Sequence, residues 1–168
     1  MQNKNLLKWT AYTLVVLLAA ILQGTPNLFI IAGVMPLLII PCVIAISMFE
    51  GETPGAVFGI LGGLIWDIES GRAFGYNALF LMIMCIAAAL LIQNLFRNTI
   101  ASAFIFCICA VALHEFITWF FFIYLTGDER FVFAFLRIIL PTAAYTVIFV
   151  LPIYFLVRRV SRRFFEAQ

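Results

Sequence analysis

The sequence predicts an all-α protein, a polytopic membrane helix bundle with about six transmembrane helices. The first observation is composition: 65% of the 168 residues are hydrophobic, 11% are charged, and the mean hydropathy is +1.15. Soluble domains hold about 45–50% apolar and about 25% charged residues, and a soluble fold cannot hide such an excess of apolar surface. The net charge of +2 also argues against a nucleic-acid-binding protein, which needs a strongly basic face.

The second observation is a series of six apolar runs separated by short polar breaks. A bilayer-spanning helix takes about 20 apolar residues, so six of them leave roughly 48 residues for all loops and tails. We therefore expect a single integral membrane domain over residues 1–168, with no extramembrane domain. Strands are not expected, because an open sheet edge cannot satisfy its hydrogen bonds in lipid. The expected spans are residues 6–23, 28–49, 54–68, 76–95, 99–125 and 131–157.

The breaks between the first runs have the composition of turns. The first run is interpreted as an uncleaved first helix, and it ends at residues 24–27, which hold a glycine and a proline. The second run ends at a turn over residues 50–52, after which Thr53 can cap the third helix and Pro54 can begin it. The third run ends at the glycine-containing break 70–75. The later runs end at short polar segments, and the last one leads into an arginine-rich tail.

Lysines and arginines predict the orientation of the bundle, because they are enriched in cytoplasmic loops. An even number of spans places both termini on one side, whereas Arg72 and Arg130 lie on the other. We therefore expect both termini in the cytoplasm. The arginine tail then acts as an orientation anchor or contacts anionic lipid headgroups. The basic residues on the expected cytoplasmic side are Lys4, Lys8, Arg97, Arg158, Arg159, Arg162 and Arg163.

The third run carries glycines at helical spacing. Gly55 and Gly59 are four residues apart, and Gly62 and Gly63 follow three and four residues later. This spacing forms one smooth helix face that lets another backbone approach closely. The face predicts tight packing, either within the chain or against another subunit, such as a second copy in a homodimer.

A polar segment follows this glycine face. Asp67 lies at the end of the third helix, Ser70 and Gly71 allow a sharp reversal, and Asn77 can cap the fourth helix. The Asp67 carboxylate can accept hydrogen bonds from loop amides or pair with Arg72. A role in binding a partner or a ligand is the alternative.

Three ionisable residues interrupt the fifth and sixth runs: His114, Glu115 and Arg137. An unpaired charge in a span costs about 2.5–3.5 kcal/mol. Glu115 and Arg137 lie about 15 Å and about 9 Å from the same surface at 1.5 Å per residue, and an arginine stem can cover several ångströms. We therefore predict a Glu115–Arg137 pair that His114 or Asp67 can join. Such a cluster serves as an interhelical clamp, in transport or proton handling, or in partner recognition.

Motifs of known catalytic chemistry are missing from the sequence. It has no His-Glu-x-x-His, no Gly-x-Ser-x-Gly and no Walker loop. The cysteines lie inside apolar runs, and Cys107 and Cys109 point about 200° apart on a helix, which is poor geometry for a metal. We therefore interpret the cysteines as core residues and expect no catalytic, cofactor-binding or metal-binding site.

Residues 54–79 resemble the signature region of the MreD family, the rod shape-determining membrane proteins of bacteria. That signature is a glycine-rich helix, an aspartate, Ser-Gly, a short spacer and Gly-x-Asn-Ala-Leu. Gln23, Pro26 and Pro36 also fit the family pattern, whereas Leu37 stands where the family often has a polar residue. The matching signature positions are Gly59, Gly63, Asp67, Ser70, Gly71, Gly75, Asn77, Ala78 and Leu79.

The resemblance implies a non-enzymatic scaffold subunit of the lateral cell-wall elongation (rod) machinery in the bacterial cytoplasmic membrane. Its expected partners are the bitopic protein MreC and an assembly that contains a peptidoglycan glycosyltransferase and transpeptidase. The family fold also resembles the six-helix substrate-binding subunits of energy-coupling-factor vitamin transporters. A small-molecule uptake subunit is therefore the alternative function. It predicts a polar cavity lined by Asp67, Arg72, Glu115 and Arg137.

Overall fold

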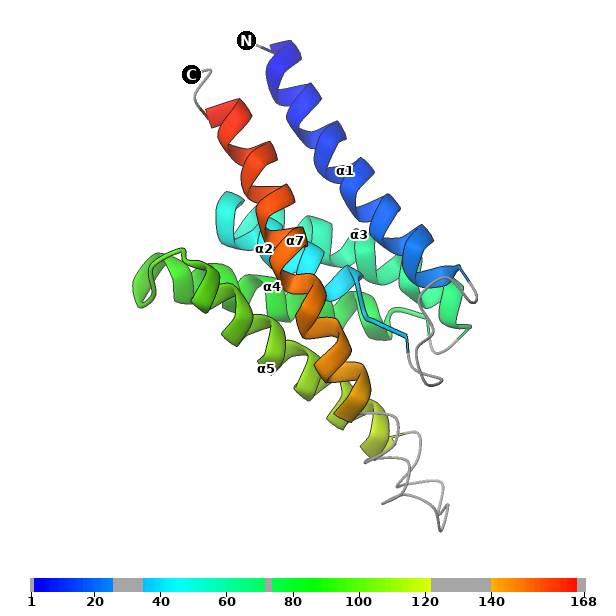
Figure 1. The fold of residues 1–168 in the computed structure, drawn as a ribbon. Coiled ribbons are helices and arrows are strands. Elements are labelled where there is room, and N and C mark those ends of the chain that lie inside the picture. Colours follow the sequence, from blue (N-terminus) through cyan, green and yellow to red (C-terminus); the bar gives the residue numbers. More distant parts are fainter. Residues whose placement is uncertain (1, 26–34, 72–73, 122–139, 166–168) are drawn as a thin grey trace.

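The computed structural model describes residues 2–25, 35–71, 74–121 and 140–165. Within these ranges the chain forms six helices and no strand (Figure 1). The predicted fold class, an all-helical membrane bundle, is confirmed. The helices are α1 (Gln2–Gly24), α2 (Ile39–Glu50), α3 (Glu52–Ser70), α4 (Tyr76–Asn94), α5 (Ile100–Trp119) and α7 (Leu140–Phe165).

Four helices are long and apolar enough to cross a bilayer, which makes the chain a multi-pass membrane protein. In contrast, α2 is apolar but has only 12 residues. At 1.5 Å per residue it extends about 18 Å, against a hydrocarbon core of about 30 Å. The four long segments are Leu6–Gly24, Tyr76–Asn94, Ile100–Trp119 and Pro141–Arg163.

Two helix ends differ from the predicted ones. In the expected span 28–49, residues 35–38 are not helical and α2 begins only at Ile39. Pro36 favours this late start, because a proline has no amide hydrogen and disfavours helical geometry at the residue before it. At the other end of the chain, α7 continues past the expected residue 157 to Phe165. The arginines of this tail are good helix formers, so the helix extends beyond the apolar segment.

The start of α3 also differs from the prediction. The helix begins at Glu52, and Gly51 is its N-cap residue, with a φ of 94°. Thr53 and Pro54 therefore lie inside the first turn, and no side chain caps the helix. A φ in this region is accessible to glycine at little cost, which explains how α2 and α3 can be joined through a single residue.

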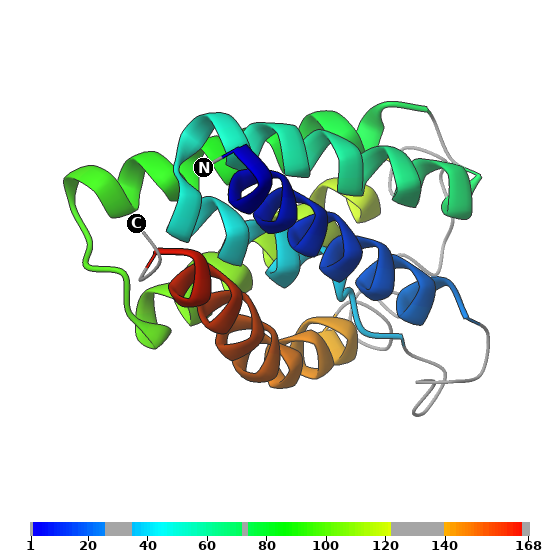
Figure 2. The ribbon, with the colours of Figure 1, turned by 90° about the horizontal axis from the view of Figure 1, so that it is seen from above.

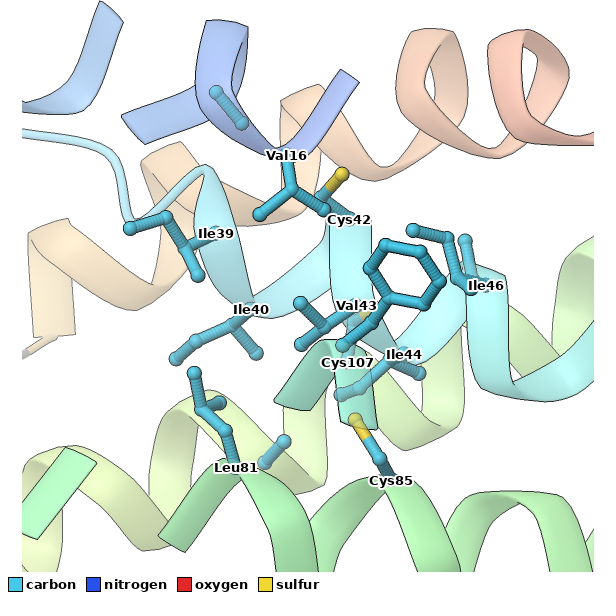
Figure 3. Packing of buried hydrophobic residues seen from close by; sticks show 14 of the residues in the cluster. Val16, Ile39, Ile40, Cys42, Val43, Ile44, Ile46, Leu81, Cys85 and Cys107 are labelled. Atoms are coloured by element: carbon cyan, nitrogen blue, oxygen red, sulfur yellow. The ribbon is translucent and has the colours of Figure 1, made fainter. Parts of the chain in front are cut away.

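The short helix α2 lies at the centre of the bundle and contacts each of the other five described helices (Figures 1 and 2). Every residue from Ile39 to Met48 is buried. Figure 3 shows six of these side chains packed with Val16 of α1, Leu81 of α4 and Cys107 of α5, namely Ile39, Ile40, Cys42, Val43, Ile44 and Ile46. The core of the protein is therefore a helix that is apolar on all sides, surrounded by the longer helices.

Side chains of two neighbouring helices accept hydrogen bonds from two backbone amides at the start of α2. The Ile39 amide donates to Oε1 of Gln23 on α1 (3.1 Å), and Gln23 is itself buried. The Leu37 amide donates to Oγ1 of Thr146 on α7 (3.0 Å). A buried amide without a partner is costly in an apolar environment, so these two bonds allow the helix to begin inside the bundle.

The end of α2 is held by Asn98 from the segment between α4 and α5. Its Nδ2 donates to the carbonyl oxygen of Met48 (2.8 Å). Its Oδ1 accepts a hydrogen bond from the hydroxyl of Tyr154 on α7 (3.2 Å). One amide side chain thus connects the last turn of α2 to α7.

Large apolar side chains cover the outer surfaces of the long helices. Leu14 on α1 is 65% exposed, Ile83 on α4 is 53% exposed, and Ile148 on α7 is 67% exposed. In water such a surface is unfavourable, but in a bilayer it faces lipid chains of the same polarity. The first residues of α1 and the last residues of α7 lie at the same end of the bundle (Figure 1).

Candidate functional site

Two of the predicted glycines bring α3 against the backbone of α4. A Cβ atom at Gly63 would overlap the backbone of Ala78, and one at Gly59 would lie 2.9 Å from the carbonyl oxygen of Leu81. Backbone atoms cannot move aside as the end of a side chain can. The close approach of α3 and α4 therefore depends on glycine at both positions.

The other two predicted glycines face α2. A Cβ atom at Gly55 would overlap the side chain of Ser47, and one at Gly62 would lie 3.0 Å from Cγ1 of Val43. All four glycines of the face are buried. The packing partners of this face are thus helices of the same chain.

Asp67 joins the end of α3 to the start of α4. Its Oδ1 accepts a hydrogen bond from the amide of Asn77 (2.9 Å), and its Oδ2 accepts from the amides of Gly75 (2.9 Å) and Ala78 (3.4 Å). The first amides of a helix have no partner within the helix, and a negative charge is favourable there. Asp67 is 2% exposed, so its carboxylate is a buried cap for α4. The sequence predicts that Asp67 accepts from loop amides or pairs with Arg72. Gly75 supplies an amide from the turn, Asn77 and Ala78 supply amides from the first turn of α4, and Arg72 lies outside the described residues.

Of the described residues in the turn between α3 and α4, two have left-handed backbone geometry. Gly71 has a φ of 60° and Gly75 has a φ of 92°. The hydroxyl of Ser70 donates to the carbonyl oxygen of Asp67 (3.4 Å). Side chains larger than glycine are strained in this geometry, which accounts for glycine at both positions.

The sequence predicts that the side chain of Asn77 caps α4, and this prediction is wrong. The side chain contacts α5 instead. Its Oδ1 lies 2.9 Å from Nε2 of His114, and since an amide oxygen only accepts, the imidazole nitrogen is the donor. The ring of His114 stacks on Trp66 of α3 at 4.6 Å between centroids, and Phe80 of α4 meets it edge-on at 5.2 Å. His114 is 1% exposed, so it connects α5 to both α3 and α4.

The second nitrogen of this imidazole lies near a carboxylate. Nδ1 of His114 is 3.4 Å from Oε1 of Glu115, without the geometry of a hydrogen bond. The two groups therefore attract each other as an ion pair only when the imidazole carries both protons. Arg137 lies outside the described residues, so the Glu115–Arg137 pair stays a prediction.

A second polar cluster was not predicted from the sequence, where Glu50 is only part of a turn. Its Oε1 accepts hydrogen bonds from the hydroxyls of Tyr12 on α1 (2.7 Å) and Ser161 on α7 (3.3 Å), and its Oε2 pairs with Lys8 on α1. This carboxylate thus connects three helices near the end that holds both termini. A signal was available, because the charge pattern places Lys8 and Glu50 on the same side of the membrane.

The polar groups described above hold helices together and do not form a recognisable catalytic or metal-binding arrangement among the described residues. In the part of the chain that the structure describes, no group of three or more His, Cys, Asp and Glu residues could hold a metal ion. Cys42, Cys85 and Cys107 are buried free thiols, and Cys109 is exposed. Both oxygens of Asp67 accept from backbone amides. At the corner where α3, α4 and α5 meet (Asp67, Asn77 and His114), the carboxylate is thus engaged with backbone, and Asn77 Oδ1 is engaged with His114 Nε2.

The chain matches a known protein family. The family model of the rod shape-determining protein MreD matches residues 3–164 of the chain. That range includes all four glycines of the α3 face, Asp67, and the Asn77–His114 contact. No curated protein and no solved structure matches the chain.

The packing of α3 predicts different effects for two neighbouring glycines. Gly63→Ala should destabilise the bundle by about 1–3 kcal/mol, because the added methyl group meets backbone of α4. Gly62→Ala should change stability by less than about 1 kcal/mol, because it meets side-chain methyl groups that can shift, and alanine favours the helix. Reversible unfolding of the purified chain in mixed detergents measures both values. Equal effects would contradict this packing.

The capping role of Asp67 predicts a loss of stability on neutralisation. Asp67→Asn should cost about 1.5–3 kcal/mol, because it removes charge-assisted hydrogen bonds and points an NH₂ group at backbone amides. The matched control is Glu69→Gln on the same helix, where the side chain is exposed and the change should stay within about 0.5 kcal/mol. The same unfolding assay applies. An unchanged free energy of unfolding in Asp67→Asn would show that the carboxylate does not stabilise the junction of α3 and α4.

Proposed function

Because this chain belongs to the family of the rod shape-determining protein MreD, we propose that it is a non-enzymatic scaffold subunit of the cell-wall elongation (rod) complex. In this role it helps to set cell shape by holding other membrane proteins in place. The scaffold binds an MreC-like bitopic protein and supports a peptidoglycan glycosyltransferase and transpeptidase. It acts in the bacterial cytoplasmic membrane with both termini in the cytoplasm.

The observation that carries this proposal is that polar side chains within the bundle join helices of the same chain to one another. Asp67 caps α4, Asn77 and His114 join α4 to α5, and Glu50 joins α1, α2 and α7. Each of these groups holds helices of the chain together, and the outer surfaces are covered by large apolar side chains. A bundle of this kind is suited to lateral contacts with other membrane helices, which form through close packing.

The same observation weakens the alternative of a small-molecule uptake subunit. That function needs polar groups that converge on an accessible cavity. Asp67, the first residue expected to line it, is 2% exposed and accepts hydrogen bonds on both oxygens. The apolar groove between α1, α2 and α7, about 230 Å³ in volume, is lined by apolar side chains and the Cys42 thiol. Arg72 and Arg137, also expected to line a polar cavity, lie outside the described residues, and among the described ones the scaffold is the better-supported function.

Affinity purification from native membranes tests the proposal. The tagged full chain, extracted in a mild detergent, should retain an MreC-like bitopic protein that mass spectrometry identifies. Asp67→Asn should reduce the retained amount at equal bundle yield, because a loosened α3–α4 corner no longer presents a fixed surface. Glu69→Gln serves as the matched control and should retain the wild-type amount.

Two outcomes would contradict the scaffold function. One is purification of the intact bundle without any MreC-like protein, from cells that contain one. The other is a stoichiometric vitamin-sized molecule retained by the purified chain in native mass spectrometry, which would favour the uptake subunit.

A further inference from the structure

The last turns of α7 carry a basic surface. A shallow surface hollow of about 640 Å³ runs along this helix, and four arginines line its end. Three of them, Arg159, Arg162 and Arg163, are exposed. Within the described ranges no carboxylate forms an ion pair with any of them. The complete lining is Pro152, Phe155, Leu156, Arg158, Arg159, Arg162 and Arg163.

An apolar groove continues from this basic surface toward the centre of the bundle. It has a volume of about 230 Å³ and lies between α1 and α7, and its lining includes Leu38, which precedes α2, and Cys42 of α2. Pro152 and Leu156 line both the groove and the basic hollow. The two features therefore adjoin along α7 and are together called the depression, which is basic near the end of α7 and apolar beyond it.

The arrangement of this depression, basic at one end and apolar beyond it, suits an amphipathic molecule that lies along α7. Leu156 and Arg163 are seven residues apart, or about 10 Å along the helix axis. The basic part lies at the end of the bundle that holds both termini (Figure 1), and the apolar part extends along the membrane-crossing segment Pro141–Arg163. An occupant would place an anionic group at the arginines and a hydrocarbon chain between α1 and α7.

We infer that this depression is a binding site for one anionic phospholipid. Arginine binds phosphate oxygens through a planar fork of donors, and exposed basic residues near a membrane surface attract anionic lipids. A soluble anion would use the arginines and leave the apolar groove empty, whereas a phospholipid uses both parts. The site does not depend on the proposed scaffold function, because it needs no protein partner.

Native mass spectrometry of the detergent-purified full chain tests the inference. Titration with dioleoyl-phosphatidylglycerol should show one saturable lipid per chain, and dioleoyl-phosphatidylcholine should bind at least fivefold more weakly. The double variant Arg159→Gln/Arg163→Gln should weaken phosphatidylglycerol binding roughly tenfold or more, because it removes two exposed cations. The matched variant Arg159→Lys/Arg163→Lys keeps the charge and should retain the preference for the anionic lipid.

A second pair of variants tests the apolar part. Leu18→Trp fills the groove from α1 and should weaken phosphatidylglycerol binding, because Leu18 lines the groove. Ile21→Trp adds the same side chain at an exposed position outside the groove lining and should leave binding unchanged. All four positions are exposed, so circular dichroism should report a wild-type fold for every variant.

Several results would overturn the inference. Equal binding of the two lipids, wild-type binding by the Arg→Gln variant, or wild-type binding by Leu18→Trp would each exclude this site. Complete displacement of the lipid by millimolar inorganic phosphate would show a site for a free anion. Loss of a protein partner in the Arg→Gln variant, with lipid binding unchanged, would assign the arginines to an acidic protein segment.

Discussion

The constraint on which the rest of the structure depends is the burial of α2. This helix is too short to cross a bilayer and lies against every other described helix. In an apolar environment each unsatisfied backbone group is costly, so both ends of α2 need partners from elsewhere in the chain. Gln23, Thr146 and Asn98 supply them from α1, α7 and the α4–α5 connection. The positions of these three segments are thus tied to one buried helix.

The α3–α4–α5 corner is built on the same principle. Glycines remove the side chains that would keep α3 away from α4 and α2, and Asp67 then replaces the missing helical partners at the start of α4. Asn77 and His114 extend the connection to α5. Much of segment 54–79 therefore serves to fix α3 to α2, α4 and α5. In the scaffold function that we propose, helices fixed in this way would present a constant surface to a membrane partner.

The sequence was most informative where a local pattern has one physical solution. Composition alone separates a membrane bundle from a soluble fold, and the glycine spacing indicates a close helix contact. The amide contacts of Asp67 follow from its place before a turn. The Asn77–His114 contact and the Glu50 cluster were not predicted, because their members lie far apart in the sequence. Likewise, the apolar run 28–49 does not reveal that its helix begins at Ile39, since both its helical and non-helical residues are apolar.

Hydrogen exchange of the full chain in lipid nanodiscs tests the central role of α2 most directly. The amides of Leu37 and Ile39, whose acceptors are side chains on other helices, should exchange as slowly as amides in the middle of α2. Their protection should far exceed that of the exposed segment 95–98. Exchange of these two amides at the rate of that exposed segment would contradict the account, because α2 would then begin without the partners that its burial requires.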